Sequence, residues 1–232
     1  MRYMPLLLLF ILILAGCSQQ KVEEKKPVPL EKPIPGIIPE SIMAKAEKKY
    51  GVYARKRYEA YNTKLRELQH SSSEIKLEEI NRFFNKVPYV EDTVVWGQKD
   101  YWATPLEFLG KDKGDCEDFV IAKYFSLRDL GVESKKLFFS YVKSIHLNRP
   151  HMVLSYFETP YSIPLILDSI NFKIFPADKR EDLIPVYNFN GETLYHAIKK
   201  GQNGRKVTDA KSNEKAHKMW DKLLNDIKAN KL

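Results

Sequence analysis

Residues 114–131 place a cysteine at the start of a buried helix. The run that follows Gly114-Asp115-Cys116-Glu117-Asp118 has apolar residues at helical spacing, and a glycine ends it. We therefore expect a helix with one buried face over 119–130, with Cys116 in its first turn. Asp115 is expected to be the N-cap residue, with Asp118 three positions later in place of the usual glutamate of a capping box.

Two opposing electrostatic effects act on this cysteine. The free N–H groups and the dipole of a helix N-terminus stabilise a thiolate, which is the form that attacks a carbonyl carbon. Three carboxylates in the same turn, those of Asp115, Glu117 and Asp118, should instead raise the pKa of the thiol. A bound cation would remove this conflict. The alternative is a small buried cysteine beside ordinary capping acids.

The composition predicts a folded domain and gives no support for nucleic-acid binding. Of the 232 residues, 44% are apolar and 12% are aromatic, which is too many for a disordered chain. The formal charge of +8 is spread over segments of mixed sign. The lysine-rich runs at 45–49 and 199–206 lack the interleaved aromatic residues of a nucleic-acid module. We therefore expect these runs to be solvated faces and expect no nucleic-acid partner.

The beginning of the chain is expected to direct export and to carry an anchor. Residues 1–16 are typical of a signal peptide, with Arg2 before an apolar run that is too short for a permanent membrane helix. The sequence Leu14-Ala15-Gly16-Cys17 resembles a bacterial lipobox, which implies cleavage before Cys17 and acylation of that residue. The alternatives are an ordinary cleaved signal and an uncleaved anchor. Ser18 is typical of lipoproteins sorted to the outer membrane.

A tether is expected to separate this anchor from one folded domain. Residues 17–39 are rich in proline, lysine and glutamate, a composition that favours a semi-stiff linker. The domain then spans 40–232. If Cys17 carries lipid, Cys116 is the remaining thiol and has no disulfide partner within the chain. A lone thiol in an oxidising compartment is a liability unless it is functional or deeply buried.

The hydrophobic period changes along the domain from helical to strand-like. The pattern predicts helices at 40–69, at 74–86, after Thr104-Pro105, at 119–130, near 193–199 and at 213–229. Beyond residue 130 a period of two predicts strands at 137–142, 151–157 and 165–168. The sequence therefore predicts an α+β domain in which helices pack on a sheet.

The second and third predicted strands are expected to form a hairpin. If the turn is centred near Thr159 and Pro160, residues whose numbers sum to about 319 lie opposite each other. This register pairs His151 with Asp168 and brings an imidazole to a carboxylate at one end of the sheet. His146, five residues earlier, is the alternative base, and the register favours His151.

Five separated motifs resemble those of the bacterial transglutaminase-like cysteine proteinases. In chain order they are Ile80-Asn81-Arg82-Phe83-Phe84-Asn85, Asp100-Tyr101-Trp102-Ala103-Thr104-Pro105-Leu106-Glu107-Phe108, Gly114-Asp115-Cys116-Glu117-Asp118, His151-Met152-Val153-Leu154 and Leu167-Asp168. The resemblance covers residues 77–171. It implies a papain/transglutaminase-like α+β fold, in which the N-terminal helices and the helix bearing the nucleophile pack on an antiparallel sheet.

The resemblance also implies catalytic roles. Cys116 would be the nucleophile, His151 would take its proton and later protonate the leaving amine, and Asp168 would hold the imidazole in the correct tautomer. The backbone N–H of Cys116 and the side chain of Gln98 are the expected oxyanion donors.

Members of this family depend on calcium, and the resemblance implies a Ca²⁺ site here. The implied ligands are Asp115 and Glu117, on either side of the cysteine, with Asp100 as a further ligand. Backbone carbonyl groups of the 96–102 loop are expected to complete the six to eight oxygens that calcium prefers.

The function implied by the resemblance is that of a calcium-dependent cysteine endopeptidase. Its substrate would be a large exported surface adhesin of a biofilm-forming cell, and its partners would include an inner-membrane regulatory receptor. It would act in the periplasm, anchored to the outer membrane by lipid. Two alternatives are a transglutaminase-like amidase or acyltransferase on peptidoglycan peptides or protein glutamine, and a non-catalytic binding lipoprotein.

Overall fold

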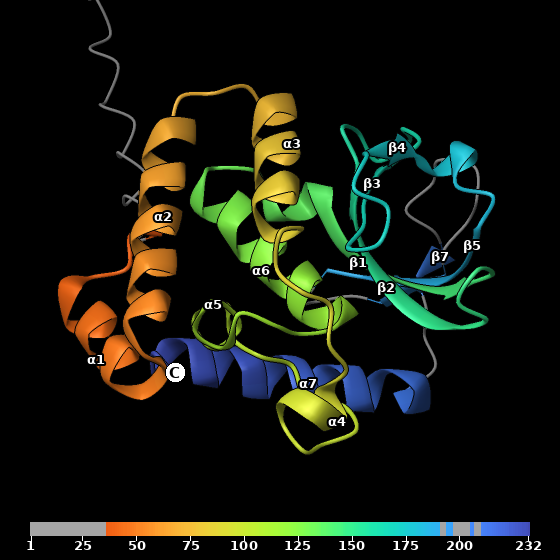
Figure 1. Ribbon diagram of the computed structural model, residues 1–232. Helices are drawn as coiled ribbons and strands as arrows, with labels where there is room; N and C mark the ends of the chain where they lie inside the picture. Colours follow the sequence, from red (N-terminus) through yellow and green to blue (C-terminus); the bar gives the residue numbers. More distant parts are fainter. Residues whose placement is uncertain (1–35, 191–193, 197–204, 207–209) are drawn as a thin grey trace, which may run out of the picture. The chain divides into compact units, whose positions relative to one another are not determined.

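The computed structural model describes residues 36–190, 194–196, 205–206 and 210–232. The helices are α1 (Glu40–Tyr50), α2 (Val52–Leu68), α3 (Ser73–Phe84), α4 (Asp92–Val95), α5 (Pro105–Lys111), α6 (Cys116–Asp129), η1 (Ser134–Lys136), η2 (Ala177–Lys179) and α7 (Ala210–Lys228). The strands are β1 (Leu137–Ser144), β2 (Arg149–Tyr156), β3 (Leu165–Leu167), β4 (Phe175–Pro176), β5 (Leu183–Phe189), β6 (Leu194–His196) and β7 (Arg205–Lys206). The predicted α+β class is confirmed (Figure 1).

The strands form a single antiparallel sheet among the described residues, in the order β4-β3-β2-β1-β5-β6-β7. Alternation along β1 and β2 gives the sheet two different faces. Phe139 and Leu154, which are direct partners, belong to the larger core cluster shared with the helices. Val142 and Val153 belong to a smaller apolar cluster on the other face.

Helix α6 is buried on both sides. It contacts α3 on one side and strand β2 on the other (Figure 1). Phe119 of α6 packs against Phe108 of α5, with ring centroids 4.9 Å apart, and Tyr124 packs against Phe139 of β1, with centroids 4.8 Å apart. Trp220 of α7 contacts the rings of both Tyr124 and Phe139. Packing on every side therefore fixes the position of the first residue of α6.

The predicted single helix over 40–69 is wrong, because Gly51 divides it into α1 and α2. Gly51 has φ +88°, a backbone conformation that glycine adopts without the steric cost of a side chain. Its N–H donates to the carbonyl of Glu47, 2.8 Å away, and so ends α1. The apolar periodicity continues past this break, which explains why the pattern indicated one helix.

Other local predictions have mixed outcomes. The helix predicted after Thr104-Pro105 is confirmed as α5, and the structure adds a capping box between Thr104 and Glu107. The closing helix is also confirmed as α7. The short helix predicted near 193–199 is wrong at Leu194–His196, where the chain pairs with β5 as strand β6. The rest of that segment lies outside the described residues.

The predicted signal peptide, Cys17 and tether lie almost entirely outside the described residues. The helices and strands given above all belong to one compact unit. Among the described residues, no helix has both the length and the apolar character needed to cross a bilayer.

Candidate active site

The cysteine predicted at a helix start is the first residue of α6. Asp115 precedes it with extended backbone angles (φ -111°, ψ -165°) and is the N-cap residue, as predicted. The predicted capping box is wrong, because the Asp115 side chain makes no capping hydrogen bond. Asp118 Oδ1 instead accepts a hydrogen bond from the backbone N–H of Ala103, 2.8 Å away. The first turn of α6 is therefore tied to the segment before α5.

Gly114 lets the chain enter this turn at close range. A Cβ atom at this position would lie 2.3 Å from Oδ2 of Asp118 and 2.9 Å from the ring of Phe108, so either neighbour would have to move. The Gly114 carbonyl also accepts a hydrogen bond from the N–H of Val90, 2.8 Å away. The glycine is thus required by the close approach of two buried side chains.

The thiol of Cys116 points to a carboxylate. Sγ donates a hydrogen bond to Oε2 of Glu117, 3.0 Å away. Burial raises the pKa of the Cys116 thiol well above its ordinary value, and the charges of Glu117 and Asp115 raise it further. A backbone hydrogen bond from Met152 acts in the opposite direction. Burial first and the neighbouring carboxylates second therefore favour the protonated thiol in the metal-free protein.

His151 and Asp168 are joined by a buried hydrogen bond. Nε2 of His151 donates to Oδ1 of Asp168, 2.8 Å away, and the N–H of Ile170 donates to the same oxygen. Burial alone would raise the pKa of Asp168, but the bonds from His151, Ile170 and Arg180 bring it below its ordinary value. The carboxylate is therefore ionised at neutral pH. Nδ1 of His151 is buried and has no hydrogen-bond partner.

The register that predicted this contact is wrong by two residues. Strands β2 and β3 pair Leu154 with Leu167 and Tyr156 with Leu165, so partner numbers sum to 321. Asp168 lies just beyond the end of β3 and reaches His151 diagonally. A shift of two leaves every side chain on the same face of the sheet, because side chains alternate with a period of two. The predicted neighbours therefore still meet.

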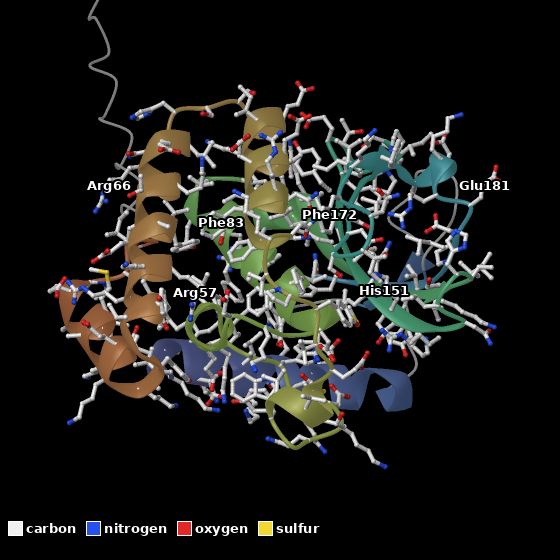
Figure 2. The ribbon with its side chains drawn as sticks, in the orientation of Figure 1. Arg57, Arg66, Phe83, His151, Phe172 and Glu181 are labelled. Carbon is white, nitrogen blue, oxygen red and sulfur yellow. The ribbon has the colours of Figure 1, made fainter. Side chains whose placement is uncertain are left out.

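One cavity of 470 Å³ is lined by both Cys116 and His151. The Cys116 sulfur accepts a backbone hydrogen bond from Met152, the neighbour of His151 on β2. Figure 2 marks His151 on this strand, which contacts α6. The walls include the aromatic and thioether side chains of Tyr89, Trp102, Tyr141, Tyr187, Met152 and Met219. Cys116 as a whole residue is half-buried, and its sulfur lies at the buried end of the cavity wall, where burial raises its pKa.

Two other predicted residues, His146 and Gln98, do not line the 470 Å³ cavity. His146 lies in the turn between β1 and β2 and lines a separate 370 Å³ cavity, which also borders His151 and Asp168. Gln98 is exposed and lies outside the lining of the 470 Å³ cavity. The hydrogen bond to Asp168 thus comes from His151, and an oxyanion role for Gln98 has no support in the geometry.

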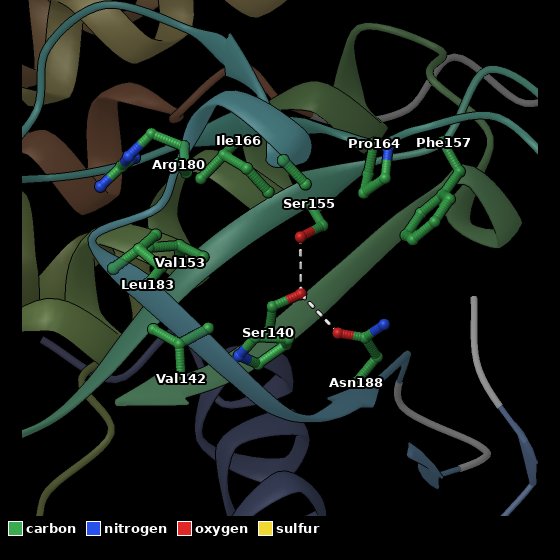
Figure 3. Close-up of a pocket in the computed structure, with 12 residues that line it drawn as sticks. Ser140, Val142, Val153, Ser155, Phe157, Pro164, Ile166, Arg180, Leu183 and Asn188 are labelled. Carbon is green, nitrogen blue, oxygen red and sulfur yellow. Dashed lines mark hydrogen bonds between the residues drawn. The ribbon is translucent and has the colours of Figure 1, made fainter. Parts of the chain in front are cut away.

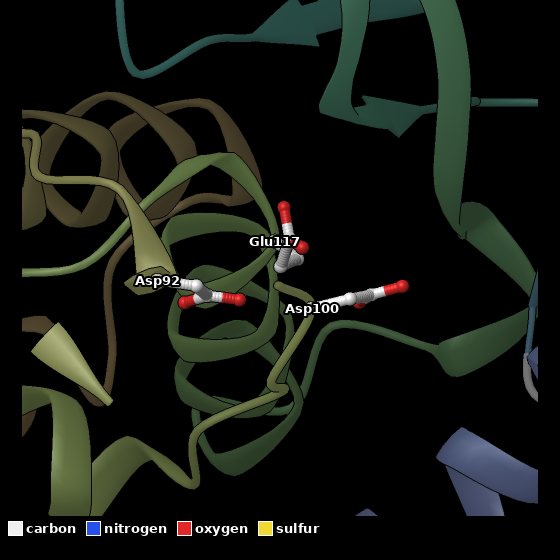
Figure 4. A group of neighbouring side chains, drawn as sticks. All are labelled: Asp92, Asp100 and Glu117. Carbon is white, nitrogen blue, oxygen red and sulfur yellow. The ribbon is translucent and has the colours of Figure 1, made fainter. Parts of the chain in front are cut away.

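Carboxylates gather beside the thiol in two overlapping groups. Asp92, Asp100 and Glu117 each bring one oxygen within 4.8 Å of the others (Figure 4). Asp92 also forms such a group with Asp115 and Asp118. The predicted ligands Asp100, Asp115 and Glu117 therefore surround one region, and Asp92 is common to both groups.

The donor atoms of this acidic cluster fit a hard divalent cation. Oδ1 of Asp92, Oδ1 of Asp115 and Oδ2 of Asp118 are buried without a hydrogen-bond partner. Burial raises the pKa of Asp92 to about 7 and that of Asp115 to about 8, and repulsion between the acids adds to both shifts. Burial likewise raises the pKa of Asp118 well above its ordinary value. A cation would neutralise this charge and bind oxygens that nothing else satisfies.

Sequence reasoning missed Asp92 and Asp118 as members of this cluster. Asp118 was assigned to a capping box because it is three residues from the N-cap. Asp92 begins the short helix α4, which the sequence pattern indicated as loop or strand. Its link to the site is the hydrogen bond that it accepts from the N–H of Tyr101, beside Asp100. No local signal in the sequence marks this contact.

The family model of the bacterial transglutaminase-like cysteine proteinases matches residues 50–181, more than half of the chain. The chain belongs to this family. It is therefore a transglutaminase-like cysteine peptidase, and its α+β fold is the one that the sequence motifs implied. No curated protein sequence matches it.

Solved structures of one relative agree with this assignment. Legionella pneumophila LapG is 41% identical, with a TM-score of 0.65, over 79% of this chain and 96% of that one. Calcium-bound L. pneumophila LapG is 39% identical, with a TM-score of 0.67, over 81% and 98%. EGTA-treated L. pneumophila LapG is 41% identical, with a TM-score of 0.66, over 80% and 95%. Calcium is thus bound in a protein similar to this cysteine peptidase.

The raised carboxyl pKa values predict an unusual pH dependence of stability for the metal-free peptidase. The folded state keeps protons on Asp92 and Asp115 up to about pH 7 and pH 8, whereas the unfolded chain releases them near pH 4. The free energy of unfolding should therefore fall as the pH rises between these limits. We expect the Tm in EGTA, followed by circular dichroism, to decrease from about pH 5 to about pH 8.

Two controls test this prediction. In EGTA, Asp92→Asn should reduce the dependence of the Tm on pH because it removes one of the titrating acids. Asp178→Asn, at an exposed carboxylate, should leave the dependence of the Tm on pH unchanged. The pKa of Asp168 is lowered, so its contribution is lost only in more acid solution, outside this range. A metal-free Tm that rises between pH 5 and pH 8 would contradict the buried, protonated state of these acids.

Proposed function

We propose that this peptidase is a calcium-dependent cysteine endopeptidase that uses Cys116, His151 and Asp168. The observation that carries the proposal is the buried His151–Asp168 hydrogen bond at a cavity that the Cys116 thiol also lines. In this arrangement Asp168 holds the Nε2–H tautomer, and Nδ1 of His151 is left as the free basic nitrogen. A thiol and an imidazole with an unpartnered nitrogen, on residues that line the same cavity, are the groups that nucleophilic catalysis by a cysteine requires.

The reaction needs two protons, each of which His151 first takes up and then passes on. Nδ1 of His151 takes the proton of Sγ, and the thiolate attacks the scissile carbonyl carbon to form a carbon–sulfur bond. His151 then gives that proton to the leaving amine as the carbon–nitrogen bond breaks. In the second half, His151 takes a proton from water, the hydroxide displaces the thiolate from the acyl group, and the thiolate is reprotonated. The ionised Asp168 stabilises the imidazolium at each stage.

We propose that calcium is held by Asp92, Asp100, Asp115 and Glu117. When bound, calcium would supply positive charge that offsets these acids and engages the carboxylate to which the thiol now donates. Glu117 would then no longer compete with His151 for the Sγ proton. The unpartnered oxygens of Asp92 and Asp115, and the calcium-bound structure of L. pneumophila LapG, support this assignment.

The substrate, partners and location are proposed from the sequence motifs. We propose an exported surface adhesin as the substrate and a receptor in the inner membrane as a regulator. The mixed aromatic and charged walls of the 470 Å³ cavity suit an extended polypeptide more than a small apolar ligand. We also propose that lipid on Cys17 anchors the peptidase to the outer membrane and that its domain works in the periplasm.

Cys116→Ala should abolish proteolysis without unfolding the protein. Alanine favours the helix and removes only the sulfur, so the Tm should change little while the cleavage rate falls by at least about 10³-fold. Cleavage of adhesin fragments and of muropeptides is followed by mass spectrometry in the presence of calcium. Lys113→Ala, at an exposed residue three positions earlier, is the matched control and should keep full activity.

The two substrate classes separate the candidate functions. Cleavage of muropeptides and not of protein fragments would replace the endopeptidase with the amidase alternative. Proteolysis that survives in Cys116→Ala would end the assignment of the nucleophile.

Activity should require calcium and should depend on Asp92. EGTA should inactivate the peptidase, and calcium should restore activity whereas magnesium should not, because calcium accepts many carboxylate oxygens and magnesium keeps several of its waters. Asp92→Asn should raise the calcium concentration for half-maximal activity by at least about tenfold. The assay titrates calcium in EGTA buffers, with Asp178→Asn as the control. Equal calcium curves for both variants would remove Asp92 from the ligand set.

Membrane attachment should depend on Cys17. In cells, Cys17→Ser should move the protein from the outer-membrane fraction to the soluble periplasmic fraction, because acyl chains supply about 0.8 kcal/mol per buried methylene. Immunoblots of fractionated cells measure the distribution, and Gln19→Ala is the control. A Cys17→Ser protein that stays in the outer-membrane fraction would exclude lipid as its anchor.

A further inference from the structure

The Asp168 carboxylate has a second buried partner besides His151. Its Oδ1 accepts from His151, and its Oδ2 accepts from Nη2 of Arg180, 2.7 Å away. The Arg180 and Asp168 side chains are 3% and 1% exposed, so solvent does not screen this ion pair. Each oxygen of the carboxylate is therefore committed to a different group.

Arg180 is itself held in one orientation. Its Nε donates to Oδ1 of Asp182 at 2.9 Å, and its Nη2 donates to Oδ2 of Asp182 at 2.7 Å. This two-point contact fixes the plane of the guanidinium, which a lysine ammonium group could not do. Figure 3 shows the guanidinium pointing away from the Ser140–Ser155 hydrogen bond on the neighbouring part of the sheet. The group is thus aimed by Asp182 at Asp168.

The backbone of Asp168 is anchored by two other elements. Its carbonyl accepts hydrogen bonds from Nδ2 of Asn85, at the end of α3, and from Nζ of Lys123, in α6. Lys123 is fully buried, and burial lowers the pKa of its ammonium group to about 7, although the charge of Asp168 opposes that shift. These two bonds keep the carboxylate from moving away, so Arg180 is left to set its orientation and its effective charge.

We propose that Arg180 is a positioning residue for the His151–Asp168 pair: it keeps Oδ1 on the imidazole and weakens the attraction of the carboxylate for the imidazolium proton. This inference rests on the proposed function, because it concerns the same catalytic groups. A general acid must release its proton to the leaving amine, and a lone buried carboxylate would retain that proton too strongly. The charge of Arg180 offsets this effect.

The remaining charged and titratable groups around the pair come from several elements. On the sheet, the turn between β1 and β2 and the loop after η2 they are Arg149, Tyr141, Tyr187, His146 and Asp182, and on α6 they are Lys123, Cys116 and Glu117. The segments before α6 add Tyr89, Glu91, Lys99, Asp100 and Asp115. Arg180 and Asp182 have opposite charges, so their removal should shift the titration of His151 in opposite directions. A purely structural role for either residue predicts no such opposition.

The test is an NMR titration of the His151 imidazole in the full chain with calcium. It is done in a Cys116→Ala background, so that no thiol titrates and no proteolysis is needed. Arg180→Gln keeps an N–H donor and removes the charge, and it should raise the His151 midpoint by about one pH unit. Arg180→Lys keeps the charge and should leave the midpoint closer to that of the parent protein.

Asp182→Asn and Arg82→Gln complete the experiment. Asp182→Asn should lower the midpoint by about half a unit, because it removes a competing negative charge and keeps the guanidinium. Arg82 is an exposed arginine paired with Glu79, and Arg82→Gln should leave the midpoint unchanged. The His151 signal is identified by its loss in His151→Gln.

An unchanged or lowered midpoint in Arg180→Gln would overturn the proposal. If Arg180→Gln does not fold, Asp182→Asn provides the test. A His151 midpoint that does not fall in Asp182→Asn would then overturn the proposal. The titration and the cleavage assay are independent. If the midpoint shifts are as expected but the protein does not cleave polypeptides, only the proposed function is refuted. If the protein cleaves normally but the midpoint shifts are absent, only the role of Arg180 is refuted.

Discussion

Negative charge crowded around one buried thiol is the constraint on which the site depends. The dipole at a helix N-terminus, where Cys116 lies in α6, typically stabilises an anion by about 0.3 to 1 kcal/mol. Burial and the charges of Glu117 and Asp115 oppose this, and the thiol donates its proton to Glu117. Positive charge placed among these acids would lower the pKa of the thiol again, so the acidic cluster and the thiol are linked electrostatically.

The scaffold brings this helix start to the sheet by burying α6 between α3 and β2. Aromatic packing of Phe119 and Tyr124 fixes the helix along its length, and Gly114 allows the chain to enter it at close range. The hydrogen bond from Met152 then places the sulfur beside the strand that carries His151. Hydrophobic packing thus supplies the position, and the polar groups at the end of α6 supply the chemistry.

Asp168 connects the two halves of this arrangement. Its carboxylate binds His151 and Arg180, while its carbonyl binds Asn85 of the α3 terminus and Lys123 of α6. Each donor is buried, and leaving any one unpaired costs about 1–3 kcal/mol or more. The same bonds that hold the helices to the sheet therefore set the geometry and the charge around the imidazole. Stability and function share these residues.

The sequence by itself determined what local forces decide: the α+β class, the place of Cys116 in the first turn of α6, and the start of α5 after Thr104. It also placed His151 with Asp168 despite a register error of two, because period-two alternation preserves the face of a strand. Only the tertiary structure decided the break at Gly51 and the roles of Asp92 and Arg180 beside the site. Those contacts join segments that no local periodicity relates, because they form only after the helices and the sheet have packed.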